Sequence, residues 1–261
     1  MDHIYWGRSS FIKNYDQKKF QDFLNLSSKE KEKICSNSSG LPKHIVSAEF
    51  FEIEFLDKIY HLAKSLKQIH RSNPHFLRSL LSEFSVLNYF DQPSSRTFLS
   101  FSSSESLLGL RREEIRDIKT SSTVKGETDK DALRTISSYF DAIVCRHSSD
   151  MFHWFCIWVV MNSDREIPII NAGCGKSEHP TQALLDYFTI KESFNGVVDG
   201  LNIGFVGDCL RGRTVHSLAK VLSKFNNMTM TFIAPKNLQI DSDTLSYLKN
   251  RSNKINIIQE T

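Results

Sequence analysis

The segment His179-Pro180-Thr181-Gln182 places an imidazole, a proline and an amide within four consecutive residues. The apolar run Pro168–Ile170 predicts a strand before it, and Pro180 is typical of the first turn of a helix. His179 is therefore expected at a helix N-terminus, where backbone N–H groups and the positive end of the helix dipole are concentrated. An imidazole N–H there can polarise a carbonyl group or stabilise an oxyanion. The alternative is that His179 only caps the helix.

Hydroxyl and guanidinium groups follow a second apolar segment. Val86–Phe90 predicts a strand, and Phe98–Leu110 has the apolar spacing of a helix. Between them lies the run Pro93-Ser94-Ser95-Arg96-Thr97. Hydroxyls, an arginine and backbone N–H groups at a helix start can bind phosphate. Serine is also a common N-cap residue, so a serine-capped helix without a ligand is the alternative.

Two further cations stand where a ligand can bind. Ala142–Cys145 predicts a buried strand that ends in Arg146, and open α/β sheets bind ligands at the carboxyl ends of their strands. A surface ion pair is the alternative for this arginine. The polar run Ser121–Glu127 predicts an exposed loop that carries Lys125, and the alternative is that this lysine only keeps the loop soluble.

The composition excludes several classes of protein. The 261 residues contain 33 Lys and Arg against 30 Asp and Glu, and a net charge of +3 indicates neither a nucleic-acid nor an acidic-membrane partner. The five cysteines are scattered and include no C-x-x-C, so neither a disulfide framework nor a metal site is expected. The longest apolar run, Phe152–Met161, is too short to span a bilayer. We therefore expect a cytoplasmic protein without a metal or other cofactor.

The order of predicted elements indicates an α/β protein with two doubly wound parallel-sheet domains joined by a long helix. From Leu201 onward strands and helices alternate as βαβαβ, which is half of a doubly wound sheet. The turn Gly207–Arg213 lacks G-x-G-x-x-G, which argues against a dinucleotide. The expected divisions are an N-terminal helical extension with a linker, a first domain, an interdomain helix and a partial second domain, at residues 1–40, 41–180, 181–196 and 197–261.

Taken together, the motifs resemble those of one family, the carbamoyltransferases, and within it the aspartate carbamoyltransferase catalytic chains. The matching segments occur in the family's order from about Leu41 onward; they are Pro93–Thr97, Ser122–Glu127, Arg146-His147, His179–Asp186 and Gly212–Leu218. The resemblance implies transfer of the carbamoyl group of carbamoyl phosphate to the amine of L-aspartate, as a step of pyrimidine biosynthesis and without a metal.

The resemblance also implies a role for each matched residue. Ser94, Ser95, Arg96 and Thr97 would bind the phosphate, and Arg146 would bridge the phosphate and the carbonyl oxygen. His179 would donate to that oxygen, Gln182 would hold the carbamoyl NH2 group, and Arg213 would bind a carboxylate of aspartate. Ser122 and Lys125 resemble a loop that reaches a neighbouring subunit's site, which implies a homotrimer with shared active sites.

Three departures from the family pattern support a second hypothesis. Phe98 replaces a second arginine, and Ser102 stands where many members have glutamate. The chain ends at Thr261, whereas the family continues with the rest of its aspartate-binding domain, so the second domain is expected to be incomplete. Arg213 alone would then face the two carboxylates of aspartate, and weak turnover is expected. The alternative function is a catalytically impaired homologue that binds carbamoyl phosphate or assembles with a complete chain.

Overall fold

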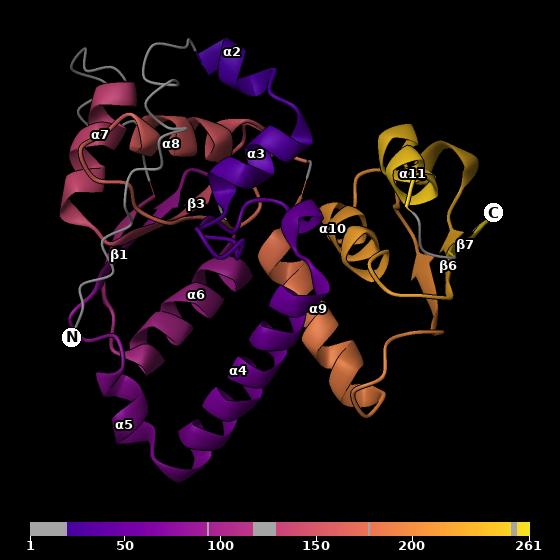
Figure 1. Cartoon of the computed structure of the whole chain (residues 1–261), viewed down its shortest axis with the longest axis horizontal. Helices are drawn as coiled ribbons and strands as arrows, with labels where there is room; N and C mark the ends of the chain where they lie inside the picture. The colour runs from indigo at the N-terminus through magenta and orange to yellow at the C-terminus, as the bar shows by residue number, and fades with distance from the viewer. Residues whose placement is uncertain (1–19, 93, 117–128, 177, 252–254) are drawn as a thin grey trace. The chain divides into compact units, whose positions relative to one another are not determined.

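The computed structural model describes residues 20–92, 94–116, 129–176, 178–251 and 255–261 (Figure 1). These residues form two compact units, and each unit consists of two segments of the chain. Unit 1 contains the residues up to Val46 and Lys64–Cys174, and unit 2 contains Ser47–Ala63 and Gly175–Thr261. Each predicted domain was one continuous stretch of sequence. In the structure, helix α4 (Ile53–Ser72) contributes to both units, so neither unit is continuous in sequence.

Unit 1 is built on a four-stranded parallel sheet with the order β2-β1-β3-β4. The strands are β1 (Ser85–Phe90), β2 (Arg111–Ile115), β3 (Ala142–Arg146) and β4 (Ile169–Asn171). β1 and β3 are almost wholly buried, as expected for central parallel strands. β2 was not predicted, because four of its five residues are charged and exposed and show no apolar alternation. It forms at the sheet edge, where charged side chains are tolerated.

Helices cover the sheet of unit 1 on both faces, with α6 on one side and α7 and α8 on the other (Figure 1). The helices of this unit are α2 (Phe20–Leu24), α3 (Ser28–Cys35), α5 (Pro74–Ser79), α6 (Ser95–Leu108), α7 (Asp129–Tyr139) and α8 (Phe152–Met161). α6 ends at Gly109 in the left-handed region, with φ of 82°. A Cβ atom there would collide with the carbonyl oxygen of Arg78, so the position requires glycine.

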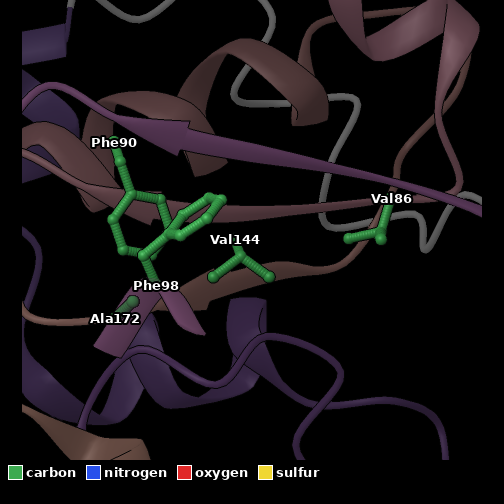
Figure 2. Close-up of a cluster of buried hydrophobic side chains, with 5 residues drawn as sticks. All are labelled: Val86, Phe90, Phe98, Val144 and Ala172. Carbon is green, nitrogen blue, oxygen red and sulfur yellow. The ribbon is translucent and has the colours of Figure 1, made fainter. Parts of the chain in front are cut away.

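An apolar cluster lies where β1 ends and α6 begins (Figure 2). Its buried members are Val86, Phe90, Phe98, Val144 and Ala172. Phe90 is the last residue of β1 and Phe98 lies in the first turn of α6, and their rings meet edge to face at 5.5 Å and 89°. The cluster therefore packs the start of α6 against the end of the sheet.

Unit 2 contains a three-stranded parallel sheet with the order β5-β6-β7. Its strands are β5 (Asn202–Val206), β6 (Met228–Ile233) and β7 (Ile255–Glu260), and its helical segments are η1 (Ala48–Phe50), the first half of α4, α9 (Pro180–Ser193), α10 (Arg213–Leu222), η4 (Lys236–Leu238) and α11 (Ser242–Lys249). The predicted βαβαβ order is confirmed. Lys191 of α9 forms an ion pair with Asp57 of α4. The hydrophobic side chains Met228, Met230 and Phe232 of β6 are fully buried.

The two parallel sheets and their helices confirm the predicted α/β fold class. Among the described residues, no helix is long and apolar enough to cross a membrane.

Candidate functional site

The predicted phosphate-binding residues of unit 1 lie where two neighbouring strands end. Phe90 of β1 pairs in register with Arg146 of β3. Beyond the strand, the backbone N–H of Asp91 donates to the carbonyl oxygen of Arg146 over 3.0 Å. The chain just before α6 is thus held against the end of β3 at Asp91 and Gln92.

The start of α6 is not capped by a serine side chain. Ser94 occupies the N-cap position, but its hydroxyl makes no capping bond and lies 3.0 Å from the hydroxyl of Thr97. Ser94 and Thr97 are half-buried, and Ser95 and Arg96 are exposed. The simple serine-capped helix was therefore the wrong alternative. The first-turn N–H groups, three hydroxyls and a guanidinium gather at the positive end of the helix dipole, which suits an oxyanion.

Arg146 is a buried residue, and the surface position considered for it is wrong. Its side chain is 7% exposed, and Nη1 donates to the carbonyl oxygen of Ala172 over 3.1 Å. Ala172 directly follows β4, so the guanidinium is attached to the end of a second strand. A buried, hydrogen-bonded arginine at the carboxyl edge of a parallel sheet is well placed to bind an anion.

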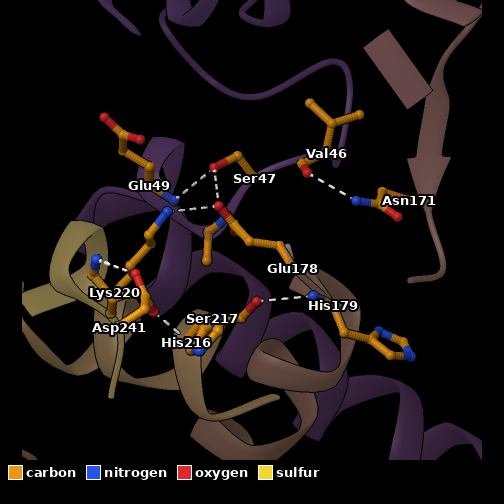
Figure 3. Close-up of polar contacts among 12 residues, drawn as sticks. Val46, Ser47, Glu49, Asn171, Glu178, His179, His216, Ser217, Lys220 and Asp241 are labelled. Carbon is orange, nitrogen blue, oxygen red and sulfur yellow. Dashed lines mark hydrogen bonds and ion pairs between the residues drawn. The ribbon is translucent and has the colours of Figure 1, made fainter. Parts of the chain in front are cut away.

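Asn171 supports this edge and was missed by the sequence reasoning. Its side-chain oxygen accepts from the N–H groups of Gly173 and Cys174 at 2.9 and 2.8 Å, and its amide nitrogen donates to the carbonyl oxygen of Val46 (Figure 3). The side chain is fully buried. An asparagine directly after an apolar strand was the only available signal. Ser122 and Lys125 of the predicted lysine loop lie outside the described residues.

In unit 2, His179 occupies the N-terminus of α9 as predicted. Pro180 is the first residue of the helix, and the His179 side chain makes no capping bond to α9, so simple capping is not its role. The backbone N–H of His179 instead donates to the hydroxyl of Ser217 over 2.9 Å. Nδ1 of the ring lies 3.3 Å from the hydroxyl of Thr181. Figure 3 shows the ring pointing away from Ser217 and Glu178.

Gln182 and Arg213 are also held by hydrogen bonds within unit 2. The amide nitrogen of Gln182 donates to Asp186 over 2.9 Å. Burial raises the pKa of Asp186, and this hydrogen bond opposes the rise. Arg213 is the first residue of α10, and its Nη1 donates to the carbonyl oxygen of Gly175 over 2.6 Å. The guanidinium is thereby attached to the loop that leads to His179.

Glu178 is a further residue that the sequence reasoning missed. Its buried carboxylate accepts from the Ser47 hydroxyl at 3.0 Å, from the Ala48 N–H at 2.7 Å and from the Lys220 ammonium at 2.8 Å (Figure 3). Nothing in the sequence around Glu178 predicts its burial. A weak signal was the polar spacing of Arg213, Ser217 and Lys220, which is that of one helix face.

The two departures in α6 have different structural consequences. Phe98, in place of an arginine, is buried in the apolar cluster, and the guanidinium of Arg116 lies 3.6 Å from the centre of its ring. Ser102 is buried, and its hydroxyl has no hydrogen-bond partner among the described residues. One turn further, Glu105 is buried and accepts from the amide of Asn88 over 2.7 Å.

Comparison with known proteins gives a consistent result. Residues 43–192 match the family model described as aspartate/ornithine carbamoyltransferase, carbamoyl-P binding domain. The chain is 38% identical over 212 residues to the aspartate carbamoyltransferase catalytic subunit of Methanocaldococcus jannaschii, which covers 81% of this chain and 67% of that protein. It is 36% identical over 210 residues to the chloroplastic aspartate carbamoyltransferase 3 of Pisum sativum, covering 79% of this chain and 51% of that enzyme. It therefore spans between half and two thirds of these relatives.

Comparison with solved structures identifies similar proteins of the same kind. The aspartate transcarbamoylase of Trypanosoma cruzi in complex with N-(phosphonacetyl)-L-aspartic acid superimposes with a TM-score of 0.77 at 35% identity, covering 86% of this chain and 68% of that one. The catalytic subunit of the M. jannaschii enzyme superimposes with a TM-score of 0.72 at 37% identity, covering 84% and 68%.

Proposed function

Because this chain belongs to the aspartate/ornithine carbamoyltransferase family, we propose that it transfers the carbamoyl group of carbamoyl phosphate to the amine of L-aspartate. The products are N-carbamoyl-L-aspartate and phosphate, as in pyrimidine biosynthesis. The observation that carries the proposal is the start of α6, where the Ser94 side chain makes no capping bond and several hydroxyls and a guanidinium meet the helix N-terminus. The domain roles follow: residues 41–180 bind carbamoyl phosphate, and residues 197–261 form part of the aspartate-binding domain.

The phosphate is bound by unit 1. Ser94, Ser95 and Thr97 offer hydroxyl donors, and Arg96 offers a guanidinium fork at the positive end of α6. Arg146 donates to the phosphate and to the carbonyl oxygen. Together these donors hold a dianion and stabilise the charge that builds up on it as it leaves.

The carbamoyl group and the acceptor are bound by His179, Gln182 and Arg213. The lone pair of the aspartate amine attacks the carbonyl carbon, and the carbonyl oxygen becomes an oxyanion that accepts a hydrogen bond from the His179 ring. Gln182 accepts from the carbamoyl NH2 group, and Arg213 binds one carboxylate of aspartate as a fork. The carbonyl group then re-forms as the bond from carbon to the phosphate oxygen breaks, and phosphate leaves with the electron pair and takes up the proton that the amine loses.

The acceptor distinguishes this activity from that of the other enzyme named in the family. Arg213 suits a carboxylate, and aspartate has two carboxylates whereas ornithine has one. Trypanosoma cruzi aspartate transcarbamoylase has been solved in complex with carbamoyl phosphate and aspartate. The test is product formation from carbamoyl phosphate with L-aspartate and, separately, with L-ornithine. Carbamoyl aspartate from the first and no product from the second supports the proposal, and the reverse contradicts it.

A catalytically impaired carbamoyl-phosphate-binding homologue is the second candidate. Phe98, buried where the family has an arginine, leaves one cation fewer in the first turn of α6. Binding of carbamoyl phosphate by calorimetry without product from either acceptor would favour this function.

Assembly and location form part of the proposal. Ser122 and Lys125 match the loop that completes a neighbouring subunit's site, so we expect a homotrimer with shared active sites. Mixing inactive Lys125→Ala chains with inactive His179→Ala chains should restore part of the activity, because a hybrid trimer can combine two intact sets of residues. Mixed trimers without activity would contradict shared sites.

A cytoplasmic location is the other part of the proposal. All five cysteines are buried thiols, as suits the cytoplasm.

A further inference from the structure

One face of α10 carries a row of polar side chains that we call the α10 polar row, consisting of Arg213, Ser217, Lys220 and Lys224. Residues at these spacings follow one another along one side of a helix. Arg213 donates to Gly175 O, Ser217 accepts from His179 N–H, and Lys220 pairs with Glu178. Lys224, just beyond the helix, pairs with Glu52 at 2.7 Å. Three consecutive members of the row thus contact Gly175, His179 and Glu178.

The Glu178 carboxylate accepts three hydrogen bonds. Oε1 accepts from Ser47 and Lys220, and Oε2 accepts from the backbone N–H of Ala48. The side chains of Lys220 and Glu178 are only 16% and 11% exposed. A buried carboxylate with three donors can occupy very few positions without losing one of them, and each loss leaves a buried charge poorly satisfied.

Lys220 stays charged in this environment. Burial alone would lower the pKa of its ammonium, but the adjacent Glu178 carboxylate reverses that effect and holds the pKa above the ordinary lysine value. Lys220 Nζ also lies 5.4 Å from the centre of the Tyr247 ring. Lys220 therefore carries its charge at neutral pH.

We propose that Glu178 and Lys220 are positioning residues that hold the backbone of His179 so that its ring meets the carbonyl oxygen of carbamoyl phosphate. Glu178 directly precedes His179, so a fixed Glu178 side chain restricts the movement of the adjacent His179 backbone and supports its bond to Ser217. The proposal rests on the proposed function for the role of His179. A misplaced donor costs rate although the substrate still binds.

The test uses Glu178→Gln and Lys220→Met in the full chain. Glu178→Gln preserves size and an acceptor for Ala48, and Lys220→Met preserves most of the side-chain volume. We expect hydrogen exchange of the His179 amide to become about tenfold faster or more, while amides of β6 keep their rates. We also expect kcat to fall roughly tenfold to a hundredfold with an unchanged KM for carbamoyl phosphate. Lys220→Arg should retain most of the wild-type values.

Glu54 and Lys58 provide the matched control. They also form an ion pair in unit 2, at 2.7 Å, but their side chains are 75% and 54% exposed. Glu54→Gln and Lys58→Met remove the same charges from the surface and should change neither the exchange of the His179 amide nor kcat.

The possible outcomes separate the proposal from the proposed function. A His179 exchange rate that matches the controls overturns the proposal, and so does faster exchange spread equally over β6, which would indicate a purely structural pair. Local acceleration with an unchanged kcat in an active protein also overturns it. If the wild type forms no product, the proposed function fails, and the positioning of His179 by the pair is still decided by the exchange rates.

Discussion

The two units hold their predicted site residues by different means. In unit 1, the start of α6 is placed by apolar packing, with Phe98 against Phe90 in the cluster at the sheet end (Figure 2). In unit 2, His179 is placed by hydrogen bonds and a buried ion pair, through Ser217 on one side and Glu178 on the other (Figure 3).

The difference matches what each half of the proposed reaction needs. Apolar packing is non-directional and positions a whole helix end. That suffices for phosphate, which has several oxygens and is met by several N–H and hydroxyl donors. A single developing oxyanion needs one donor at a defined place, and directional bonds can fix an individual residue. Removing a residue of the apolar cluster should therefore lower the free energy of unfolding. Removing His179 or a residue that holds it by hydrogen bonds should instead lower the rate of carbamoyl transfer.

Phe98→Ala is the largest expected perturbation. Deleting a buried aromatic ring should lower the free energy of unfolding by about 3–5 kcal/mol, because it removes apolar burial and leaves a cavity under the start of α6. Chemical denaturation followed by circular dichroism measures the loss. Leu99→Ala, whose side chain is 62% exposed on the same helix, is the control and should change little. Equal losses for the two variants would show that the cluster does not hold α6.

His179→Ala should lower the catalytic rate rather than the stability of the fold. We expect kcat to fall by about 10²–10³-fold, as for loss of one oxyanion donor. The KM for carbamoyl phosphate and the denaturation midpoint should barely change, because the ring points away from the network that holds the backbone. Steady-state kinetics measures the effect, and His75→Ala, an exposed histidine, is the control. An unchanged kcat would remove His179 from the mechanism.

Arg96→Ala should weaken binding and leave the fold intact. Loss of a charge-assisted hydrogen-bonding fork costs about 1.5–3 kcal/mol, or roughly tenfold to a hundredfold in affinity for phosphate and carbamoyl phosphate. Calorimetry with both ligands is the measurement, and Arg71→Ala removes an exposed arginine elsewhere in unit 1. Arg96→Lys should recover only part of the affinity, since lysine lacks the fork. Wild-type affinity in Arg96→Ala would make Arg96 a simple surface residue.

Glu105→Gln should give the smallest effect, and one that depends on pH. Burial raises the pKa of Glu105, although the Asn88 hydrogen bond and Arg112 oppose the rise. Because the pKa is higher in the folded state, ionisation of Glu105 costs the folded state more than the unfolded state. The protein is therefore most stable below the ordinary pKa of 4.5, where Glu105 is protonated in both states, and it loses stability as pH rises through the folded-state pKa. The variant should therefore be more stable than the wild type at neutral pH.

That advantage should disappear in acid, where the wild-type carboxyl is protonated. Denaturation midpoints of both proteins across this pH range are the measurement. Glu113→Gln, on the exposed strand β2, should show no such pH dependence. A constant difference between Glu105→Gln and the wild type at all pH values would contradict the assignment.

Much of the fold could be predicted because the relevant signals act over a few residues. The strands predicted at Val86–Phe90 and Ala142–Cys145 each agree with β1 and β3 to within one residue. Strand β2 escaped prediction because its charged side chains follow no apolar pattern and it forms only by pairing with β1. Helix α5 was also missed, since a six-residue helix has too few apolar positions to show a period.

By itself, the sequence determined the order of the chemical groups and their positions at strand ends and helix starts, including Arg146 at the end of β3 and His179 before α9. Local apolar spacing and Pro180 were sufficient for this, because those preferences need no distant partner. Only the tertiary structure decided what holds His179. The donors to Glu178 lie 42 residues away at Lys220 and 130 and 131 residues away at Ala48 and Ser47, so no local pattern could reveal them. Because the Glu178 carboxylate is buried, its hydrogen bonds must come from these protein donors, and only folding brings the three donors together.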